Sequence, residues 1–229
     1  METKRVRVIG AGLAGSEAAL QLASFGFDVD LYEMRPEKPT PAHRGGALAQ
    51  LVCSNSFKGL ALTSAHGLLK NELNMLGSFL LKAAERTAVP AGESLTVNRD
   101  LFSEEVERLI LACPNITLHR EEVKTLEGEF PTIVAAGPLA SDTLADDIFK
   151  RLGSERLHFF DAIAPVVETE SIDFEHAFYK NRWEKGETED FINCPLDKET
   201  YDLFVQKLRE AESIEPRPFE KHELFEGCL

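Results

Sequence analysis

The first forty residues contain the feature that most constrains the fold, a glycine-rich turn between two apolar stretches. Gly10, Gly12 and Gly15 stand in GxGxxG spacing after the short run VRVI at 6–9 and before an alanine- and leucine-rich run at 18–23. In a strand–turn–helix unit the first glycine permits the tight turn, the second lets backbone approach a pyrophosphate, and the third lets the helix pack closely on the strand. The helix that follows begins with unpaired N–H groups, which attract an anion. The block therefore predicts the opening of a dinucleotide-binding α/β fold.

An acidic residue closes this block at the expected distance. The segment VDLY at 29–32 follows Gly26 and leads to Glu33, whose carboxylate can accept hydrogen bonds from the hydroxyls of an adenosine ribose. A glycine turn with a purely structural role does not account for Glu33. The residues expected to bind the cofactor are Gly10, Ala11, Gly12, Leu13, Ala14, Gly15 and Glu33. The spacing does not separate FAD from NAD, whereas an S-adenosylmethionine site is disfavoured because no acidic residue opens the glycine loop.

A second glycine-containing segment, AAGPLASDTLADDI at 135–148, predicts another part of the same site. Ile133 and Val134 are expected to form a buried strand, and Ser141 to cap a helix that starts near Asp142. Gly137 then lies at the carboxyl edge of a parallel sheet, where backbone can approach a cofactor.

Composition limits the classes of partner. The net charge of −14 over 229 residues counts against a nucleic-acid partner, although one basic face can exist on an acidic protein. The four cysteines, Cys53, Cys113, Cys194 and Cys228, show no CxxC spacing and no metal-ligand spacing with the histidines, which indicates free thiols in a reducing cytoplasm and no metal site. No apolar run of about 18 residues is present, so we expect no membrane span. The last residues, ELFEGCL, read as an interrupted domain, which suggests a fragment.

The remaining chain divides into two parts. Leucines at three- and four-residue spacing predict one long amphipathic helix over 66–86, mainly scaffold, with Lys70 on its polar side. From about residue 167 the chain is charged and aromatic and contains one clear helix pattern at 197–211. We therefore expect an α/β, Rossmann-like domain with a parallel sheet over 1–166 and the start of a smaller α+β insertion domain over 167–229.

Two short segments leave alternatives open. A cluster of basic and aromatic residues could contact RNA or could be a solvated hairpin: Lys180, Arg182, Trp183 and Lys185. In LVCSNSFKG, at 51–59, an apolar run reaches Cys53, and Ser54, Asn55 and Ser56 then favour a loop. A buried, inert thiol is the commonest state of a cysteine, so Cys53 by itself is ambiguous. Cys113 and Cys194, each followed by proline, are expected to serve packing.

Taken together, the motifs resemble the folate- and FAD-dependent tRNA uracil-5-methyltransferase (TrmFO) family. The resemblance rests on VIGAGLAGSEAA, LYEMRP, LVCSNSFK, GLLKNEL, VPAG, AAGPLASDTLADDI, DAIAPVV and FEGCL, which occur in this order along the whole chain. It covers about the first half of the family's usual length. Two small departures, SLTVNRD and AAGPL, touch no residue to which chemistry is assigned.

The resemblance implies an FAD-binding domain and methylation of C5 of a uridine in the tRNA T-loop. It implies methylenetetrahydrofolate as carbon source, FAD as carrier and reductant, and NAD(P)H as electron source. It also implies two functional cysteines, which match Cys53 and Cys228; we assign Cys228 to attack on uracil C6 and Cys53 to the flavin side. A thiolate adding at C6 makes C5 nucleophilic, and such a thiol needs a lowered pKa or a neighbouring base.

Three other classes stay open from the sequence. A generic FAD/NAD(P)H oxidoreductase needs only the first glycine motif, and the same chemistry on a ribosomal RNA uridine would share every motif. A non-catalytic RNA-binding relative would be expected to lose the cysteines, which this chain retains. A disulfide reductase is disfavoured because no two cysteines are closely spaced. The oligomeric state is not predicted.

Overall fold

A four-stranded parallel sheet forms the centre of the fold. The computed structural model describes residues 4–52, 54–152, 167–181 and 189–212. The strands are β1 (Arg5–Ile9), β2 (Asp28–Tyr32), β6 (Ile116–His119) and β7 (Thr132–Val134), in the order β6-β2-β1-β7. All three pairings are parallel, with Val8 of β1 opposite Leu31 of β2. The α/β class with a parallel sheet, expected from the sequence, is confirmed.

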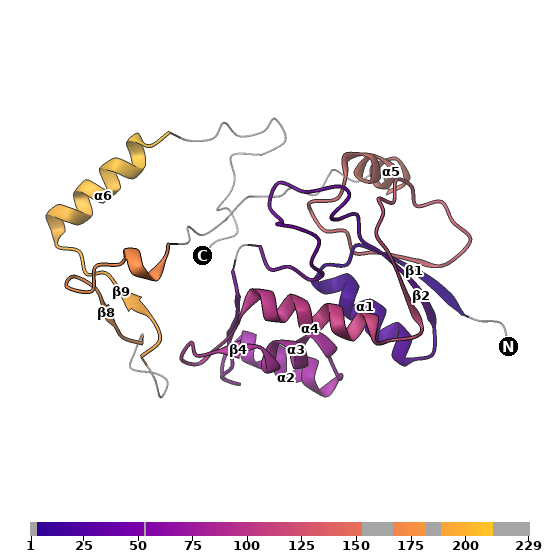
Figure 1. The fold of residues 1–229 in the computed structure, drawn as a ribbon, viewed down its shortest axis with the longest axis horizontal. Coiled ribbons are helices and arrows are strands. Elements are labelled where there is room, and N and C mark those ends of the chain that lie inside the picture. Colours follow the sequence, from indigo (N-terminus) through magenta and orange to yellow (C-terminus); the bar gives the residue numbers. More distant parts are fainter. Residues whose placement is uncertain (1–3, 53, 153–166, 182–188, 213–229) are drawn as a thin grey trace. The chain divides into compact units, whose positions relative to one another are not determined.

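Helices cover one face of this sheet. They are α1 (Leu13–Ser24) and α4 (Arg99–Leu111), with α3 (Phe79–Arg86) packed against both (Figure 1). The side chains of β1 alternate between the two faces of the sheet, which explains why helices cover one face: Val6 and Val8 are buried while Arg5 is exposed. The shared core includes Val8, Ala19, Leu20, Val29, Leu31, Leu81, Val97, Phe102, Val106 and Ile110. Gly26, at φ +81°, follows the C-cap residue Phe25 and ends α1.

A second, antiparallel sheet follows the glycine unit. It contains β3 (Ser56–Gly59), β4 (Ala88–Val89) and β5 (Ser94–Val97) in the order β3-β5-β4. Ser56 was expected in a loop but begins β3, opposite Thr96. Two hydrogen bonds of Asn55 explain this. The backbone carbonyl of Asn55 accepts from Val97 N at 3.0 Å, and the side-chain Nδ2 of Asn55 donates to Val97 O at 2.9 Å. These bonds align the chain with β5 before the strand starts.

The prediction of a single helix over 66–86 is wrong, because the segment forms two helices. The first, α2 (Ala65–Met75), ends before Gly77 at φ +78°, and α3 begins after Ser78. Ser78 Oγ accepts from Leu81 N at 3.1 Å as the N-cap of α3. The carboxylate of Glu17, on α1, accepts from Phe79 N at 3.1 Å and from Leu80 N at 2.8 Å. The new helix start is therefore held by α1.

The faces of α2 also differ from the expectation. Its leucines Leu68, Leu69 and Leu73 are exposed, whereas Lys70 is buried. The ammonium of Lys70 donates to the carbonyl oxygens of Phe57 at 2.6 Å and His66 at 2.9 Å. Lys70 thus ties α2 to β3, which agrees with a scaffold role and corrects its placement on a solvent face.

The segment around Gly137 forms a strand and a helix in the expected places. Ser141 Oγ accepts from Leu144 N at 3.3 Å at the start of α5 (Asp142–Leu152). The burial expected for the preceding strand is wrong, since Ile133 and Val134 are 38% and 42% exposed. The reason is position, because β7 is an edge strand among the described strands of this sheet.

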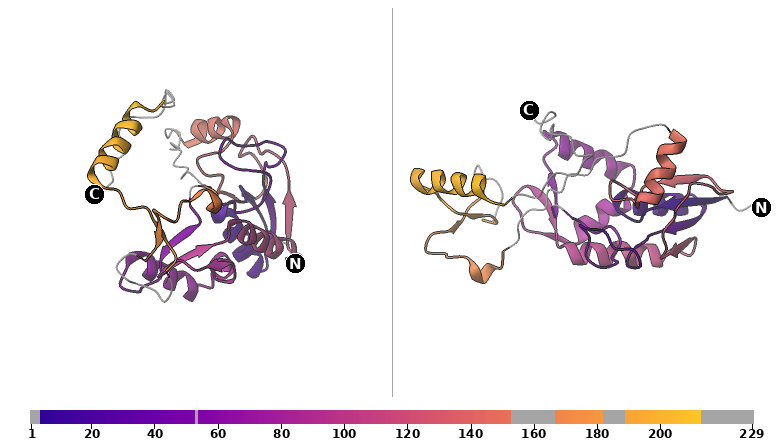
Figure 2. Two further views of the ribbon diagram at one scale, coloured as in Figure 1. Left: turned by 60° about the vertical axis from the view of Figure 1, so that its left-hand side comes forward. Right: turned by 90° about the horizontal axis from the view of Figure 1, so that it is seen from above.

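The contacts within the chain divide it into two units. The first comprises 1–89 and 94–163, and the second 90–93 and 164–229. In the second unit are a short 3₁₀ helix, η1 (Thr169–Ser171), a two-stranded antiparallel sheet of β8 (Phe178–Tyr179) and β9 (Ile192–Asn193), and α6 (Lys198–Glu210) (Figure 2). The boundary expected at 166/167 borders residues 153–166, which the structure does not describe, and stays a prediction. Within the described ranges no helix is long and apolar enough to cross a membrane.

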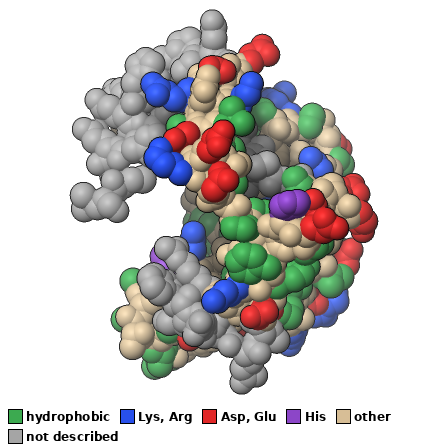
Figure 3. All heavy atoms as spheres, turned by 90° about the vertical axis from the view of Figure 1, so that its left-hand side faces the viewer, with side chains coloured by type: hydrophobic (Ala, Val, Ile, Leu, Met, Phe, Trp, Pro, Cys, Tyr) green, Lys and Arg blue, Asp and Glu red, His purple; other side chains and the backbone are tan. Residues whose placement is uncertain are grey.

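The helix expected at 197–211 is confirmed as α6, with the side chain of Asp197 accepting from Thr200 N at 2.7 Å. None of the apolar residues of α6 is buried in the structure as described. Of the basic and aromatic cluster, Lys180 is described, and Arg182, Trp183 and Lys185 lie outside the described residues. Figure 3 shows basic side chains interspersed with acidic and hydrophobic ones over the face that it draws.

Candidate dinucleotide-binding site

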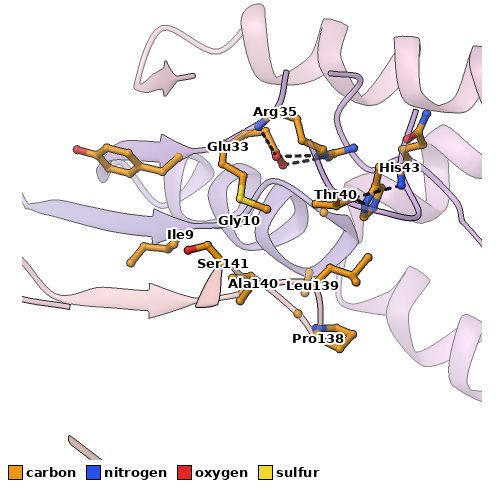
Figure 4. A pocket seen from close by; sticks show the side chains of 18 of the residues that line it. Ile9, Gly10, Glu33, Arg35, Thr40, His43, Pro138, Leu139, Ala140 and Ser141 are labelled. Carbon is orange, nitrogen blue, oxygen red and sulfur yellow. Dashed lines mark hydrogen bonds and ion pairs between the residues drawn. The ribbon is translucent and has the colours of Figure 1, made fainter. Parts of the chain in front are cut away.

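A cleft of about 380 Å³ lies within the first unit, lined by the loops that follow β1, β2 and β7 (Figure 4). This is the carboxyl edge of the parallel sheet, where ligands bind in open α/β sheets. The volume is in the range of small-molecule sites. Six of the residues predicted from the sequence line it: Gly10, Gly12, Leu13, Ala14, Glu33 and Gly137. The other two, Ala11 and Gly15, are buried.

The three glycines of the loop differ in what surrounds them. A Cβ on Gly10 would lie 2.6 Å from Ala135 O, and Gly10 has φ +97°. A Cβ on Gly15 would lie 1.7 Å from Gly10 O, so close helix–strand packing excludes a side chain there. A Cβ on Gly12 would meet no atom within 4 Å. Packing therefore explains two of the glycines and leaves the third without a structural reason.

The start of α1 presents its backbone to the cleft. Gly12 is the N-cap and no side chain caps this helix, while the flanking Leu13 and Ala14 line the cleft. Uncapped amides at a helix start carry a partial positive charge and favour an anion. Gly137, at φ +65°, brings a second stretch of backbone to the same cleft.

Glu33 and Arg35 form a buried ion pair in the cleft wall. The Nε and Nη2 atoms of Arg35 donate to the Oε1 and Oε2 atoms of Glu33 at 2.9 and 3.0 Å. Oε1 also accepts from Arg35 N at 3.0 Å, and Oε2 from Ala11 N at 3.3 Å. Burial by itself raises the pKa of Glu33, but the hydrogen bonds and charge of Arg35 outweigh it, so the pKa lies below the ordinary value. The carboxylate is thus ionised and ties β2 to the glycine loop.

A hydroxyl–imidazole pair lies beside this ion pair. Thr40 Oγ1 and His43 Nδ1 are 2.7 Å apart, and both residues line the cleft. Burial, and then the charge of Arg35, lower the pKa of His43, which favours the neutral imidazole. Arg35, Thr40 and His43 are site residues that were not predicted from the sequence. The signal was a cluster of polar residues directly after Glu33, in LYEMRP and TPAH.

The two cysteines assigned to catalysis, Cys53 and Cys228, lie outside the described residues. Their neighbours Val52 and Ser54 line the cleft, so the chain reaches it on both sides of position 53. The remaining cysteines are free thiols; Cys113 is partly buried, whereas Cys194 is exposed and contributes no core packing. In the part of the chain that the structure describes, no group of His, Cys, Asp and Glu could hold a metal ion.

Comparisons with known proteins agree with the motifs. The sequence profile of the Glucose inhibited division protein A (GIDA) family matches residues 5–229. A Lactobacillus helveticus protein named Methylenetetrahydrofolate--tRNA-(uracil-5-)-methyltransferase TrmFO is 50% identical over 99% of this chain and 55% of its own length. The Aquifex aeolicus protein of the same name is 51% identical over 99% of this chain and 51% of its own length. The chain therefore spans about half the length of these curated relatives.

Among solved structures, that of Aquifex aeolicus GidA aligns with a TM-score of 0.45 and 21% identity, over 56% of this chain and 21% of the other. The resemblance to the TrmFO family, drawn from the motifs, is confirmed by the curated relatives. Since the family profile covers nearly the whole sequence, the chain belongs to the Glucose inhibited division protein A family.

Proposed function

We propose that this chain is the nucleotide-binding half of an FAD- and folate-dependent tRNA uracil-5-methyltransferase. The observation that carries the proposal is a cleft with a glycine loop and an ionised Glu33 in a chain about half identical to proteins named for that activity. The uridine would lie in the tRNA T-loop, with methylenetetrahydrofolate as carbon source and NAD(P)H as electron source. The reaction would take place in the cytoplasm.

The residues of the cleft fit FAD. Gly12 leaves open space where a pyrophosphate would approach, and Arg35 presents a buried nitrogen that has no hydrogen-bond partner among the described residues. The residues that would hold the cofactor are Gly10, Ala11, Gly12, Leu13, Ala14, Gly15, Glu33 and Gly137. Bound there, FAD would carry the one-carbon unit and supply electrons. The chain's own contribution is to bind the adenosine and pyrophosphate and to fix their orientation.

The chemistry at the base is assigned to two thiols. Cys228 would add as a thiolate to uracil C6, which raises the electron density at C5, and Cys53 would act on the flavin side. Methyl transfer requires the base and the cofactor within reacting distance, so both thiols would have to converge there. Asn55, which is anchored to Val97, would fix the chain that carries Cys53.

Binding of RNA by a chain of charge −14 would require a local basic face. We therefore expect tRNA affinity to fall steeply between low and physiological salt, because phosphate contacts release counterions. An affinity indifferent to salt over that range would contradict an RNA substrate.

The test of the function uses the chain as it stands and the chain joined to the second half of the Aquifex aeolicus relative. Transfer of the labelled carbon of methylenetetrahydrofolate to a tRNA transcript is measured beside the same assay on ribosomal RNA. We expect methylation at the T-loop uridine with reduced flavin present. Flavin reduction by NAD(P)H without carbon transfer in either form would instead indicate a generic oxidoreductase, and methylation confined to ribosomal RNA would correct the substrate.

The cysteine assignment has its own variants and controls. Cys53→Ala and Cys228→Ala are each expected to abolish methylation while flavin content and circular dichroism stay unchanged. Cys113→Ala and Cys194→Ala are the matched controls, and at most they should lower stability. Full methylation by Cys53→Ala would return Cys53 to an inert role.

A further inference from the structure

Arg35 is a buried cation with unused hydrogen-bonding capacity. Its side chain is 4% exposed and lines the cleft. Two of its nitrogens bind Glu33, but Nη1 is buried and has no hydrogen-bond partner among the described residues. A buried guanidinium donor without an acceptor is costly, so a donor kept in this position indicates an acceptor supplied by a ligand.

Glu33, in contrast, has little capacity left. Its two oxygens accept four N–H groups, three from Arg35 and one from Ala11. A carboxylate offers about four lone-pair sites, so hydroxyls of a ribose would have to compete with these donors. Among the nitrogens of Arg35, Nη1 is the one that is buried with no hydrogen bond at all to the described residues, so its two N–H groups remain for a ligand.

The charges around the pair are of both signs. Glu33 and Arg35 together are neutral, so the ionised Glu33 does not leave a lone negative charge beside the glycine loop. Glu121 and Glu122 also line the cleft, and Glu122 is paired with Lys38 at 2.6 Å. A guanidinium suits oxygen acceptors, because its planar donors match phosphate and hydroxyl geometry.

We propose that Arg35, held in place by Glu33, recognises the nucleotide at this end of the cleft, with Nη1 donating to an oxygen of the adenosine ribose or of its phosphate. This role rests on the dinucleotide site proposed above and reverses the roles that spacing alone predicts. Glu33 becomes a positioning residue, and Arg35 becomes the residue that contacts the ligand.

The test measures nucleotide binding by calorimetry, with ADP and adenosine as probes. All groups named here belong to residues 10–141, so the chain itself is used. Arg35→Met should weaken ADP binding about 10- to 100-fold, the range for a hydrogen bond to a charged group. Glu33→Gln, which keeps one acceptor for Arg35, should weaken it less. Arg44→Met, a change at an exposed arginine in the same loop, is the matched control and should have no effect. The opposite order, with Glu33→Gln the more severe change, would overturn the proposal.

A second comparison separates ligand contact from folding. Arg35→Met leaves the carboxylate of Glu33 buried and unpaired, which is itself destabilising. The double variant Glu33→Gln/Arg35→Met removes both charges, and its fold is checked by circular dichroism. It should bind ADP as weakly as Arg35→Met does. Recovery of parental affinity in the double variant would show that the stranded carboxylate caused the loss, and would overturn the assignment.

The two probes also identify the acceptor. A loss confined to ADP places Nη1 on a phosphate, and an equal loss for ADP and adenosine places it on the ribose; either result supports the proposal. If Arg35→Met binds ADP as tightly as the parent chain does, the role of Arg35 is overturned and the dinucleotide site is not. A parent chain that does not bind ADP contradicts the dinucleotide site itself and the role of Arg35 with it.

Discussion

Two phenylalanines on amphipathic helices show how differently the two units of this chain use the same sequence pattern. Phe102, on α4 of the first unit, is fully buried, whereas Phe204, on α6 of the second, is 52% exposed. Both helices have a side-chain N-cap, Asn98 in α4 and Asp197 in α6. Periodicity and capping therefore predict that a helix exists, but not what its apolar face contacts.

The partner elements explain the difference. In the first unit, α1 and α4 pack on the four-stranded parallel sheet, and both contact α3. The described sheet of the second unit has two strands of two residues each, and such a hairpin buries little surface by itself. Whether the apolar face of a helix is buried thus depends on the elements that pack against it, and the sequence of the helix alone does not specify those elements.

The largest expected effect tests this contrast directly. Phe102→Ala should lower the free energy of unfolding by about 3–5 kcal/mol, because it removes a buried ring and leaves a cavity. Phe204→Ala, the matched change on α6, should alter it by no more than about 0.5 kcal/mol. Urea unfolding followed by circular dichroism measures both. Equal losses in the two variants would show that the ring of Phe204 is covered in solution.

The next comparison lies within the glycine loop. Gly15→Ala should lower the free energy of unfolding by about 3 kcal/mol, since its Cβ would lie 1.7 Å from Gly10 O and the backbone must shift. Gly12→Val should lower the free energy of unfolding by no more than about 1 kcal/mol, because a Cβ at Gly12 meets no atom within 4 Å and the change only replaces Gly by a poorer N-cap. It should nevertheless abolish flavin retention and ADP binding, since its side chain would occupy the pyrophosphate position.

Thermal unfolding and bound-flavin absorbance separate the two roles. A Gly12→Val protein as yellow as the parent would contradict the assignment of the pyrophosphate to this loop. Retention of flavin by Gly15→Ala at parental stability would instead show that the helix can move away from β1 without cost.

The sequence was most informative where structure depends on neighbours along the chain. The unit β1–α1–β2 follows from glycine spacing and alternation, and the start of α5 follows from Ser141. The break between α2 and α3 also had a local signal, because Gly77 and Ser78 are a helix stop and an N-cap in succession. The spacing of the leucines continues across these two residues, so periodicity alone does not show the break.

What could not be predicted depends on groups far apart in sequence. The burial of Lys70 requires the carbonyl of Phe57 on β3, and the exposure of Ile133 follows from the edge position of β7. In the site, spacing identified Glu33 but not that its oxygens are already occupied by Arg35 and Ala11. Whether the acceptor positions of a carboxylate are already occupied depends on the three-dimensional structure, and the spacing of residues in the sequence does not predict it.

A smaller effect is expected at the break between the two helices. Glu17→Gln should lower the free energy of unfolding by about 1.5–3 kcal/mol, because the charged acceptor of two backbone N–H groups of α3 is lost. Glu72→Gln, on an exposed position of α2, is the control and should change it by less than about 0.5 kcal/mol. Chemical denaturation measures both, and equal values would show that α3 does not depend on α1 for its start.

The smallest expected effect compares the pH dependence of the two units. Burial and the charge of Arg35 hold the pKa of His43 below its ordinary value, while in the unfolded chain it is about 6.5. Below about pH 6.5 the unfolded chain therefore binds more protons at this residue, so stability is lost as the pH falls from there toward the folded-state pKa. In the second unit the pKa of Asp173 is lowered by hydrogen bonds from Glu175 N and His176, so its contribution to stability is lost only below about pH 4.

Unfolding midpoints at pH 7.5 and 5.5 should differ less in His43→Asn than in the parent. The difference should be the same in Asp173→Asn as in the parent. An unchanged difference in His43→Asn would mean that folding does not lower the pKa of the imidazole, which its place beside the guanidinium of Arg35 argues against.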